Sequence, residues 1–183
     1  MMCTRKLKEM EGLIRNLVVV DFPFHDIAKE HKDDMFDQYL KKIDPDKGFN
    51  IEYTNEPLMS KLRDEFEKVV KDNFEVDDVI VPIKSYIYCQ DDFHGVYKLH
   101  NHISTATISG VMYVDPPKDG GELLLFEDGE FYKQTIEKDK IYLFPYWVWH
   151  QPTPQKDKLI RISINFEYKC TKRPLHKVSK QMW

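Results

Sequence analysis

The sequence predicts a mainly β fold with a helical flank, because its hydrophobic pattern changes near Val79. Before this residue, apolar side chains recur at helical spacing; after it, short runs of β-branched and aromatic residues alternate with turn residues. About eight such runs follow one another closely, which is typical of a jelly roll or a β-sandwich. We therefore expect antiparallel sheets in the second half and helices that cover one of them.

Two amphipathic helices are predicted in the first half. The first covers Asp26–Ile43 and ends where proline and glycine follow closely on one another. The second begins at Asn55, a residue that can cap it, and ends near Asp72. A short apolar run at Leu17–Phe22 fits either an edge strand or a buried turn. Residues 1–78 are thus expected to form a mostly helical flank.

Eight strands are predicted in the second half. Their segments have high β-propensity and are bounded by turn residues, and they cover 79–89, 96–100, 105–114, 122–126, 130–134, 140–144, 148–152 and 159–168. Asp128-Gly129, between two of these segments, is a strong signal for a two-residue hairpin turn. Residues 79–168 are therefore expected to form the core of the jelly roll.

The last predicted strand has two chemically different faces. Isoleucines alternate there with Arg161, Ser163 and Asn165, and residues two positions apart share one face of a strand. The apolar face suits packing beneath helices. The polar face suits either solvent or a hydrated cavity, such as the concave interior of a jelly roll.

The composition argues against several classes of protein. With 183 residues the chain fits one domain, and its formal net charge of −4 creates no strong attraction to nucleic acid or anionic membranes. The cysteines are scattered and lack a Cys-x-x-Cys spacing, which favours a reducing cytosol over a disulfide framework or a cysteine zinc cluster. The sequence contains neither the apolar length of a membrane span nor the pattern of a signal peptide, so we expect a cytoplasmic protein.

The end of the chain is the one strongly basic segment. Residues 169–183 contain no acidic residue and five basic ones, Lys169, Lys172, Arg173, Lys177 and Lys180. A solvated tail is the simplest interpretation of such a run. Contact of this tail with phosphate or RNA stays open as an alternative, whereas the rest of the chain gives no reason to expect nucleic acid as a partner.

His100 and His102 are the first candidate metal ligands. They lie two positions apart, so their rings project to the same side of an extended segment and can chelate one ion. His150, from a distant predicted strand, would complete a set of three ligands and leave positions open for substrate and oxygen. A lone His-x-His motif is weak evidence, because surface or core histidines unrelated to a metal show the same spacing.

Three nearby residues have simpler interpretations. His94 follows two acidic residues in a predicted loop, where it faces solvent or lines the entrance to a cavity. Trp147 and Trp149 are interpreted mainly as packing residues of the strand that carries His150.

The sequence shows neither a Ser-His-Asp or Cys-His nucleophile pattern nor a phosphate-binding loop.

Several pieces of the second half together resemble the Fe(II)/2-oxoglutarate-dependent oxygenases, and most closely a small bacterial and phage group related to prolyl 4-hydroxylases. In order, the pieces are His100–His102, Ser109–Val114, Gly120–Leu123, Phe144–His150 and Arg161–Ser163. They span about half of the chain, and their order and spacing carry the resemblance. The family fold is a double-stranded β-helix, a cupin-like jelly roll backed by helices, which agrees with the fold class predicted from the residues.

The resemblance implies a role for each candidate residue. His100 would be the first iron ligand and His150 the distal histidine. Arg161 would pair with the far carboxylate of 2-oxoglutarate, since a guanidinium fork matches a carboxylate at two points. Ser163 would assist Arg161 with its hydroxyl group, and Tyr113 would donate to the same carboxylate. A surface ion pair for Arg161 and an ordinary strand position for Ser163 are the alternatives.

One position departs from the family pattern. The family usually has His-x-Asp, whereas the third residue here is His102. Three neutral imidazoles leave the charge of a divalent ion unreduced, whereas a carboxylate would lower it by one. We predict that His102 is the third ligand. Alternatively, Glu122 or Asp128 supplies a carboxylate, or His102 contacts only the substrate.

The expected function is that of an iron(II)- and 2-oxoglutarate-dependent hydroxylase in a single domain. It would act on a C–H bond of a small-molecule or peptidyl substrate and release succinate and CO₂. One alternative is a cupin-like dioxygenase with three histidines that needs no 2-oxoglutarate, in which Arg161 binds the substrate's own carboxylate. Another alternative is a non-catalytic jelly-roll binding module with a structural zinc ion.

Overall fold

The computed structural model describes residues 16–42, 53–76, 81–90, 98–156, 160–170 and 174–176. Within these ranges the helices are α1 (His25–Glu30), α2 (Lys32–Lys42) and α3 (Glu56–Asn73). The strands are β1 (Val18–Asp21), β2 (Phe74–Glu75), β3 (Val81–Gln90), β4 (Ile108–Tyr113), β5 (Leu123–Glu127), β6 (Glu130–Gln134), β7 (Lys140–Pro145), β8 (Trp149–Pro152), β9 (Arg161–Lys169) and β10 (Leu175–His176). The predicted class, mainly β with helices in the first half, is therefore confirmed.

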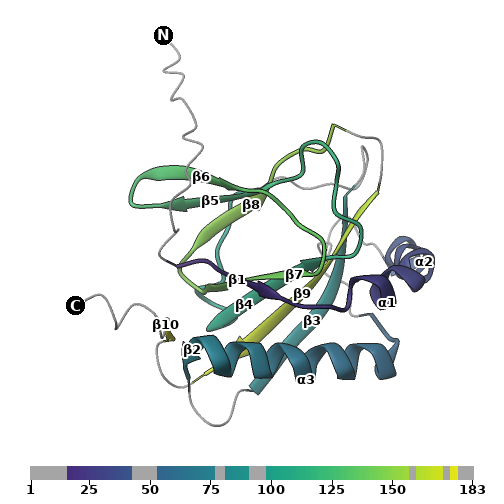
Figure 1. Ribbon diagram of the computed structural model, residues 1–183, viewed down its shortest axis with the longest axis horizontal. Coiled ribbons are helices and arrows are strands. Elements are labelled where there is room, and N and C mark those ends of the chain that lie inside the picture. The colour runs from purple at the N-terminus through teal and green to yellow at the C-terminus, as the bar shows by residue number, and fades with distance from the viewer. Residues whose placement is uncertain are drawn as a thin grey trace.

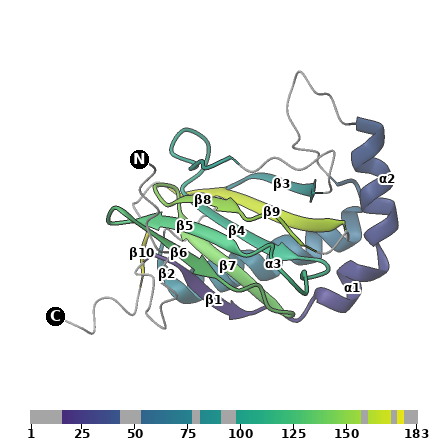
Figure 2. The ribbon, with the colours of Figure 1, turned by 90° about the horizontal axis from the view of Figure 1, so that it is seen from above.

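Two antiparallel sheets face each other and form the body of the protein (Figure 1). The main sheet has five strands in the order β1-β7-β4-β9-β3, and the smaller sheet has three in the order β6-β5-β8. Every neighbouring pair in both sheets is antiparallel. Helix α3 lies along the side of the main sheet that faces away from the smaller sheet, and α1 and α2 lie at one end of the main sheet (Figures 1 and 2).

The core between α3 and the main sheet is aromatic and closely packed. Phe66 of α3 stacks on Phe166 of β9, with their ring centroids 4.8 Å apart and their planes 18° from parallel. Gly110 of β4 makes this approach possible, because a Cβ atom at that position would lie 2.1 Å from Cε2 of Phe66. The close packing of α3 on the main sheet therefore requires a glycine at position 110.

The helices agree with the prediction at one position and differ at another. Helix α3 begins as expected, with the Asn55 side chain accepting a hydrogen bond of 3.2 Å from the backbone N–H of Leu58. The expected helix Asp26–Ile43 is divided into α1 and α2 at His31, so the single-helix prediction is wrong. The His31 N–H donates to the carbonyl of Ala28 three residues back, and this tight turn ends α1. Ile43 and the predicted break after it lie outside the described residues.

The strands follow the predicted order with two corrections, and one open alternative is decided. Leu17–Phe22 contains an edge strand, since β1 pairs with β7. Thr105–Thr107 precedes β4 rather than belonging to it, and at the described end of the predicted strand 96–100 only an isolated bridge from His100 to His150 is formed. The predicted hairpin turn is confirmed: both of its central residues, Asp128 and Gly129, have positive φ.

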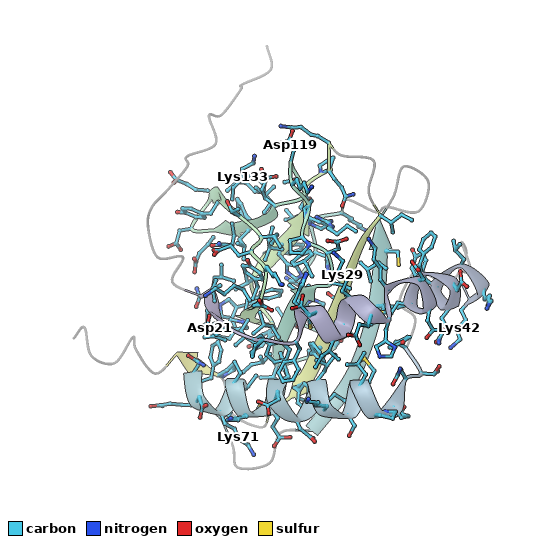
Figure 3. All side chains as sticks on the ribbon, turned by 45° about the vertical axis from the view of Figure 1, so that its right-hand side comes forward. Asp21, Lys29, Lys42, Lys71, Asp119 and Lys133 are labelled. Carbon is cyan, nitrogen blue, oxygen red and sulfur yellow. The ribbon has the colours of Figure 1, made fainter. Side chains whose placement is uncertain are left out.

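A second, smaller core fills the space between the two sheets. Its buried residues are Val111, Tyr113, Leu123, Leu125, Ile136, Tyr142, Phe144 and Val148. The polar face of β9 points into the same space: Arg161 and Ser163 are 2% and 6% exposed, and the guanidinium carbon of Arg161 lies 5.5 Å from the ring centre of Tyr113, a residue of this core. Side chains fill the interior, whereas charged residues such as Lys71 and Lys133 lie at the periphery (Figure 3). The alternative of a solvent-facing polar row on β9 is thus wrong.

The end of the chain contributes one described element. Strand β10, within the predicted basic tail, pairs with β2 directly after α3. This pairing places part of the tail beside β2.

None of the described helices combines the length and the apolar character that crossing a membrane would require.

Candidate metal centre

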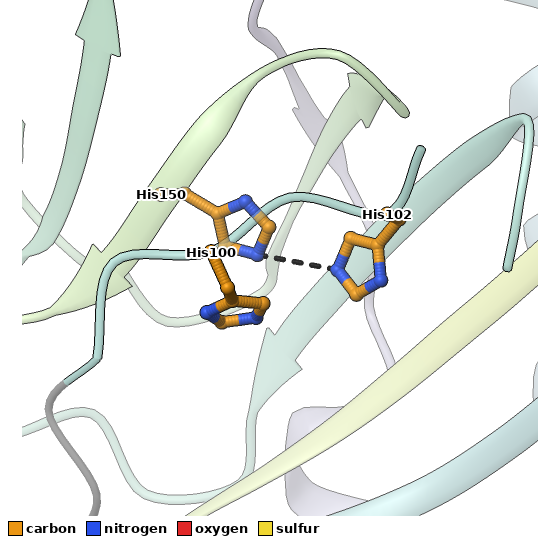
Figure 4. Close-up of side chains that lie close together, drawn as sticks. All are labelled: His100, His102 and His150. Atoms are coloured by element: carbon orange, nitrogen blue, oxygen red, sulfur yellow. Dashed lines mark hydrogen bonds between the residues drawn. The ribbon is translucent and has the colours of Figure 1, made fainter. Parts of the chain in front are cut away.

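The three predicted histidines meet between the ends of the two sheets. His100 and His150 pair through their backbones, with N–H to carbonyl distances of 3.0 and 2.8 Å, and the N–H of His102 donates to the Tyr146 carbonyl. The potential ligand atoms of the three rings all lie within 4.8 Å of one another. Figure 4 shows the rings turned toward a common point. Two segments far apart in the sequence therefore supply one cluster.

Each ring presents the same nitrogen to this common point. Nδ1 of His100 and of His150 lie 2.8 and 3.1 Å from backbone carbonyl oxygens. A carbonyl only accepts hydrogen bonds, so both Nδ1 atoms carry the proton and both Nε2 atoms keep a lone pair. Nδ1 of His102 lies 3.2 Å from the carboxylate of Glu167, which also accepts. All three rings are thus held in the tautomer that binds a metal through Nε2.

The spacing of two of the nitrogens fits adjacent ligands of a single cation. Nε2 of His102 lies 3.3 Å from Nε2 of His150 (Figure 4). When both rings are neutral and protonated at Nδ1, neither atom has a hydrogen to donate and two lone pairs face each other. Two nitrogens held about 2.1 Å from one ion lie roughly 3.0–3.4 Å apart for bond angles of about 90–110°. The pair therefore has the separation of two adjacent ligands of one metal.

The protonation of the rings favours metal binding as well. Burial, together with the nearby His100 and His102, holds the pKa of His150 well below its ordinary value. Partial burial of its ring and the neighbouring His102 also lower the pKa of His100. Neutral imidazole is the form that binds a metal, so the lowered pKa values of His100 and His150 favour metal binding at neutral pH.

Glu167 is the residue that the sequence analysis missed. It lies on β9 with 6% exposure, on the same polar face as Arg161 and Ser163. The alternation that marks those two residues as inward-facing continues to position 167, so the signal was present in the sequence. The contact with His102 was not predictable, because it joins β9 to a loop far earlier in the chain.

The two carboxylates considered as alternative ligands do not lie at the cluster. Glu122 is bound by Lys133 at 3.1 Å and by the hydroxyl group of Thr153. Asp128 lies in the exposed turn between β5 and β6. Among the described residues, the group of metal-ligating side chains that forms here consists of histidines alone.

Arg161 is buried on the inner face of β9 rather than paired on the surface. Its Nη1 donates a hydrogen bond of 2.6 Å to the carbonyl of Gly121, and its guanidinium carbon lies 5.5 Å from the centre of the Tyr113 ring. A Cβ atom on Gly121 would lie 3.1 Å from that Nη1 and 2.4 Å from Cγ of Pro117. The turn at Gly121, with φ of +68°, is therefore shaped around the arginine.

Tyr113 and Ser163 lie next to Arg161 on the same face. They are opposite each other in the register of β4 and β9, and both are buried. Burial raises the pKa of the Tyr113 phenol despite the nearby Arg161, so the hydroxyl group stays protonated and able to donate. The Ser163 hydroxyl is 3.1 Å from the Asn165 amide nitrogen, which donates to it.

Ser109 adds an unusual polar group to this surface. It lies on the inner face of β4, opposite Glu167 in the register and beside Phe144 of β7. Its Oγ is buried and has no hydrogen-bond partner among the residues that the structure describes. Buried hydroxyl groups normally have a partner, so this one is a candidate contact for a bound molecule.

The three other residues singled out in the sequence are His94, Trp147 and Trp149. His94 lies outside the described residues. Trp147 packs against the core between the sheets, as predicted, whereas Trp149 is 43% exposed on the outer face of the smaller sheet. The packing role predicted for Trp149 is thus wrong: it precedes His150 by one position, so on an extended strand its side chain points the opposite way.

Comparison with known proteins identifies the fold. No protein-family model matches the sequence, and a search of curated protein sequences finds no match. Solved structures do match, and they include prolyl hydroxylases. A viral collagen prolyl hydroxylase from Paramecium bursaria Chlorella virus-1 superposes with a TM-score of 0.65 at 13% identity, over 93% of this chain and 99% of the other.

Two further neighbours come from an animal and a bacterium. A prolyl hydroxylase of Trichoplax adhaerens, in complex with a peptide fragment of hypoxia-inducible factor, has a TM-score of 0.56 at 13% identity, over 85% of this chain and 84% of that one. HygX of Streptomyces hygroscopicus, with nickel and 2-oxoglutarate bound, has a TM-score of 0.62 at 13% identity, over 86% and 83%. The chain thus has the fold of the prolyl 4-hydroxylase-like oxygenases, and the resemblance found in the sequence is confirmed at the level of the fold.

Proposed function

We propose that this protein is an iron(II)- and 2-oxoglutarate-dependent dioxygenase that hydroxylates a C–H bond, with release of succinate and CO₂. The convergence of three imidazole nitrogens on one point, in the interior that also holds the buried Arg161, carries this proposal. The fold shared with prolyl hydroxylases supports it. We interpret the facing sheets as a double-stranded β-helix within a single oxygenase domain.

The metal-binding residues in this proposal are His100, His102 and His150. Their imidazole nitrogens suit Fe(II), which when bound would supply the activation of oxygen. The three side chains come from a loop and from β8, and the backbone bridge between His100 and His150 fixes two of them relative to each other. The protein's part is to hold these nitrogens in place before the ion arrives.

The cosubstrate-binding residues are Arg161, Tyr113 and Ser163. Arg161 would hold the far carboxylate of 2-oxoglutarate with its guanidinium fork, and the two hydroxyl groups would donate to the same carboxylate. All three side chains are buried. Because water is excluded from them, charge-assisted hydrogen bonds formed there are stronger than at the surface.

The substrate in this proposal is peptidyl or a small molecule. A peptidyl substrate is supported by the Trichoplax adhaerens neighbour, which holds a peptide fragment. The histidine cluster is reachable from solvent, since His100 is exposed whereas His102 and His150 are buried. A substrate would therefore approach past His100.

An anaerobic titration of Fe(II)-loaded protein with 2-oxoglutarate tests the proposal. We expect a weak visible charge-transfer band, and succinate once oxygen is admitted. Truncating one partner of a buried charged pair costs about 2–5 kcal/mol, so Arg161→Ala should bind 2-oxoglutarate at least about 30-fold more weakly. Arg161→Lys should be intermediate, because it keeps the charge and loses the fork.

Arg63→Ala is the matched control. Arg63 lies on α3 and pairs at 2.9 Å with Glu56, away from the cluster. This variant should show the wild-type band and wild-type succinate formation. If metal-loaded wild-type protein gives neither the band nor succinate, the proposal fails.

A three-histidine dioxygenase that needs no 2-oxoglutarate is the second candidate. The observation that favours it is the histidine at position 102, where the family pattern has a carboxylate. Arg161 would then bind a carboxylate of the substrate itself. Oxygen consumption that neither requires 2-oxoglutarate nor yields succinate would support this candidate over the first.

A further inference from the structure

The ring of His102 is held by a carboxylate, unlike the rings of His100 and His150. Its Nδ1 lies 3.2 Å from Oε1 of Glu167, and the two side chains are only 10% and 7% exposed. The other two rings direct Nδ1 to backbone carbonyl groups, which are neutral. Among the described residues, His102 is thus the histidine of the cluster whose Nδ1 partner carries a negative charge.

The group behind an imidazole affects the metal in front of it. A carboxylate fixes the tautomer and the orientation of the ring, and it makes Nε2 a stronger donor to a cation. It also brings a formal negative charge close to the ion, which three neutral imidazoles do not provide. Because the pair is buried, solvent and salt screen the attraction between this charge and the ion only weakly.

We propose that Glu167 is a positioning residue of the metal centre, and that the Glu167–His102 pair replaces the carboxylate ligand that the family pattern places at position 102. This inference deepens the proposed function and depends on it only in requiring a cation at the three histidines. The polar face of β9 supports it, since that face carries Arg161 at one end and Glu167 at the other. One strand would then orient both the cosubstrate anchor and a metal ligand.

A purely structural role for Glu167 would have different consequences. In that case the contact would only tie the loop of His102 to β9, and any acceptor of the same shape would serve. Glu167→Gln separates the two roles, because the amide keeps an oxygen acceptor and removes the charge. Glu167→Ala removes both.

Co(II) binding provides a test that does not depend on turnover. Affinity is measured by competition with a chelator, and the ligand field is read from the visible spectrum. Loss of the group behind a metal-bound histidine costs about 10–100-fold in affinity, so we expect this loss for Glu167→Ala. Glu167→Gln should lose less affinity and shift the Co(II) spectrum.

Glu122→Gln is the matched control for charge. Glu122 contacts Lys133 and Thr153 instead of a histidine, so its substitution should leave Co(II) affinity and spectrum as in the wild type. Thermal unfolding of each variant without metal reports any effect on the fold separately from the effect on Co(II).

A second pair of variants makes the test independent of simple destabilisation. His102→Asp places a carboxylate at the ligand position, where the charge of Glu167 becomes repulsive. Glu167→Gln alone should lower Co(II) affinity, whereas Glu167→Gln added to His102→Asp should leave the affinity unchanged or raise it. Such non-additivity marks coupled residues. The inference is overturned if Glu167→Gln and Glu167→Ala bind Co(II) like the wild type, or if the loss is equal in both backgrounds.

These outcomes distinguish the inference from the proposed function. Protein that binds Co(II) in a Glu167-dependent manner but never forms succinate would overturn the 2-oxoglutarate-dependent reaction and support the role of Glu167. Protein that forms succinate while its Glu167 variants keep wild-type Co(II) affinity and spectrum would do the reverse.

Discussion

The two faces of the main sheet use the same strands for different purposes. On the helix side, Ile162, Ile164 and Phe166 of β9 are fully buried in the larger core with α3. On the site side, one position along, Arg161 and Glu167 are equally hidden but make polar contacts. Buried polar groups stabilise a fold only when they meet partners, whereas apolar packing stabilises it directly. We infer that stability comes chiefly from the helix side and chemistry from the site side.

Phe66→Ala, on the helix side, should lower the stability of the protein the most. Phe66 has 0% exposure and packs on Phe166 and Tyr168, with centroid distances of 4.8 and 4.9 Å. Removing a buried phenylalanine side chain typically lowers the free energy of unfolding by about 3–5 kcal/mol, as measured by denaturant titration. Co(II) affinity of the folded variant should stay at the wild-type value. An equal loss of metal affinity would show that the two faces are not independent.

Metal loading should stabilise the protein from the site side. A ligand that binds only the folded state, at about 100 times its dissociation constant, adds about 2.7 kcal/mol to the free energy of unfolding. We expect Co(II) to produce this increase in the wild type and not in His150→Ala, since His150 is one of the three converging ligands. Denaturant titrations with and without Co(II) measure it. A similar increase in His150→Ala would place the ion elsewhere.

Gly110→Ala should destabilise the helix side through a single position of β4. The added Cβ atom would lie 2.1 Å from Cε2 of Phe66, so the ring or the helix must shift. Overpacking of this kind typically costs about 1–3 kcal/mol of unfolding free energy. Phe66→Leu in the same chain should recover part of this cost, because it removes the ring that meets the new methyl group. Additive losses in the double variant would contradict the assigned clash.

The sequence predicted the features that depend on local pattern. The change of hydrophobic period near Val79 indicated where helices give way to strands, and the Asn55 cap and the Asp128-Gly129 turn were both found in the structure. The three histidines were also named in advance, because their chemistry singles them out. Each of these signals lies within a few residues of the chain or in the chemistry of one side chain.

One local feature and one distant contact were not predicted. The division of Asp26–Ile43 at His31 accompanies a backbone hydrogen bond to Ala28, three residues back, which leaves no mark in the apolar spacing. The sequence offers Glu122 and Asp128 as alternative carboxylate ligands, whereas the structure brings Glu167 to His102. Only the tertiary fold decides which acidic residue on an inward face meets which ring, so propensity and spacing could not choose among them.

We expect Ser109→Ala to have the smallest effect on stability. Together with Thr107→Val, it compares two buried hydroxyl groups near the same strand. The Thr107 hydroxyl donates to the Cys170 carbonyl at 3.2 Å and accepts from the Cys170 N–H at 3.1 Å, whereas the Ser109 hydroxyl has no partner among the described residues. Thr107→Val should therefore cost about 1–3 kcal/mol of unfolding free energy, because it leaves buried backbone groups unpaired. Ser109→Ala should change that free energy by less than about 0.5 kcal/mol. If Ser109→Ala also weakens binding of 2-oxoglutarate or Co(II), its hydroxyl belongs to the bound state; if it destabilises the metal-free protein as Thr107→Val does, the site side contributes to stability and the contrast between the two faces fails.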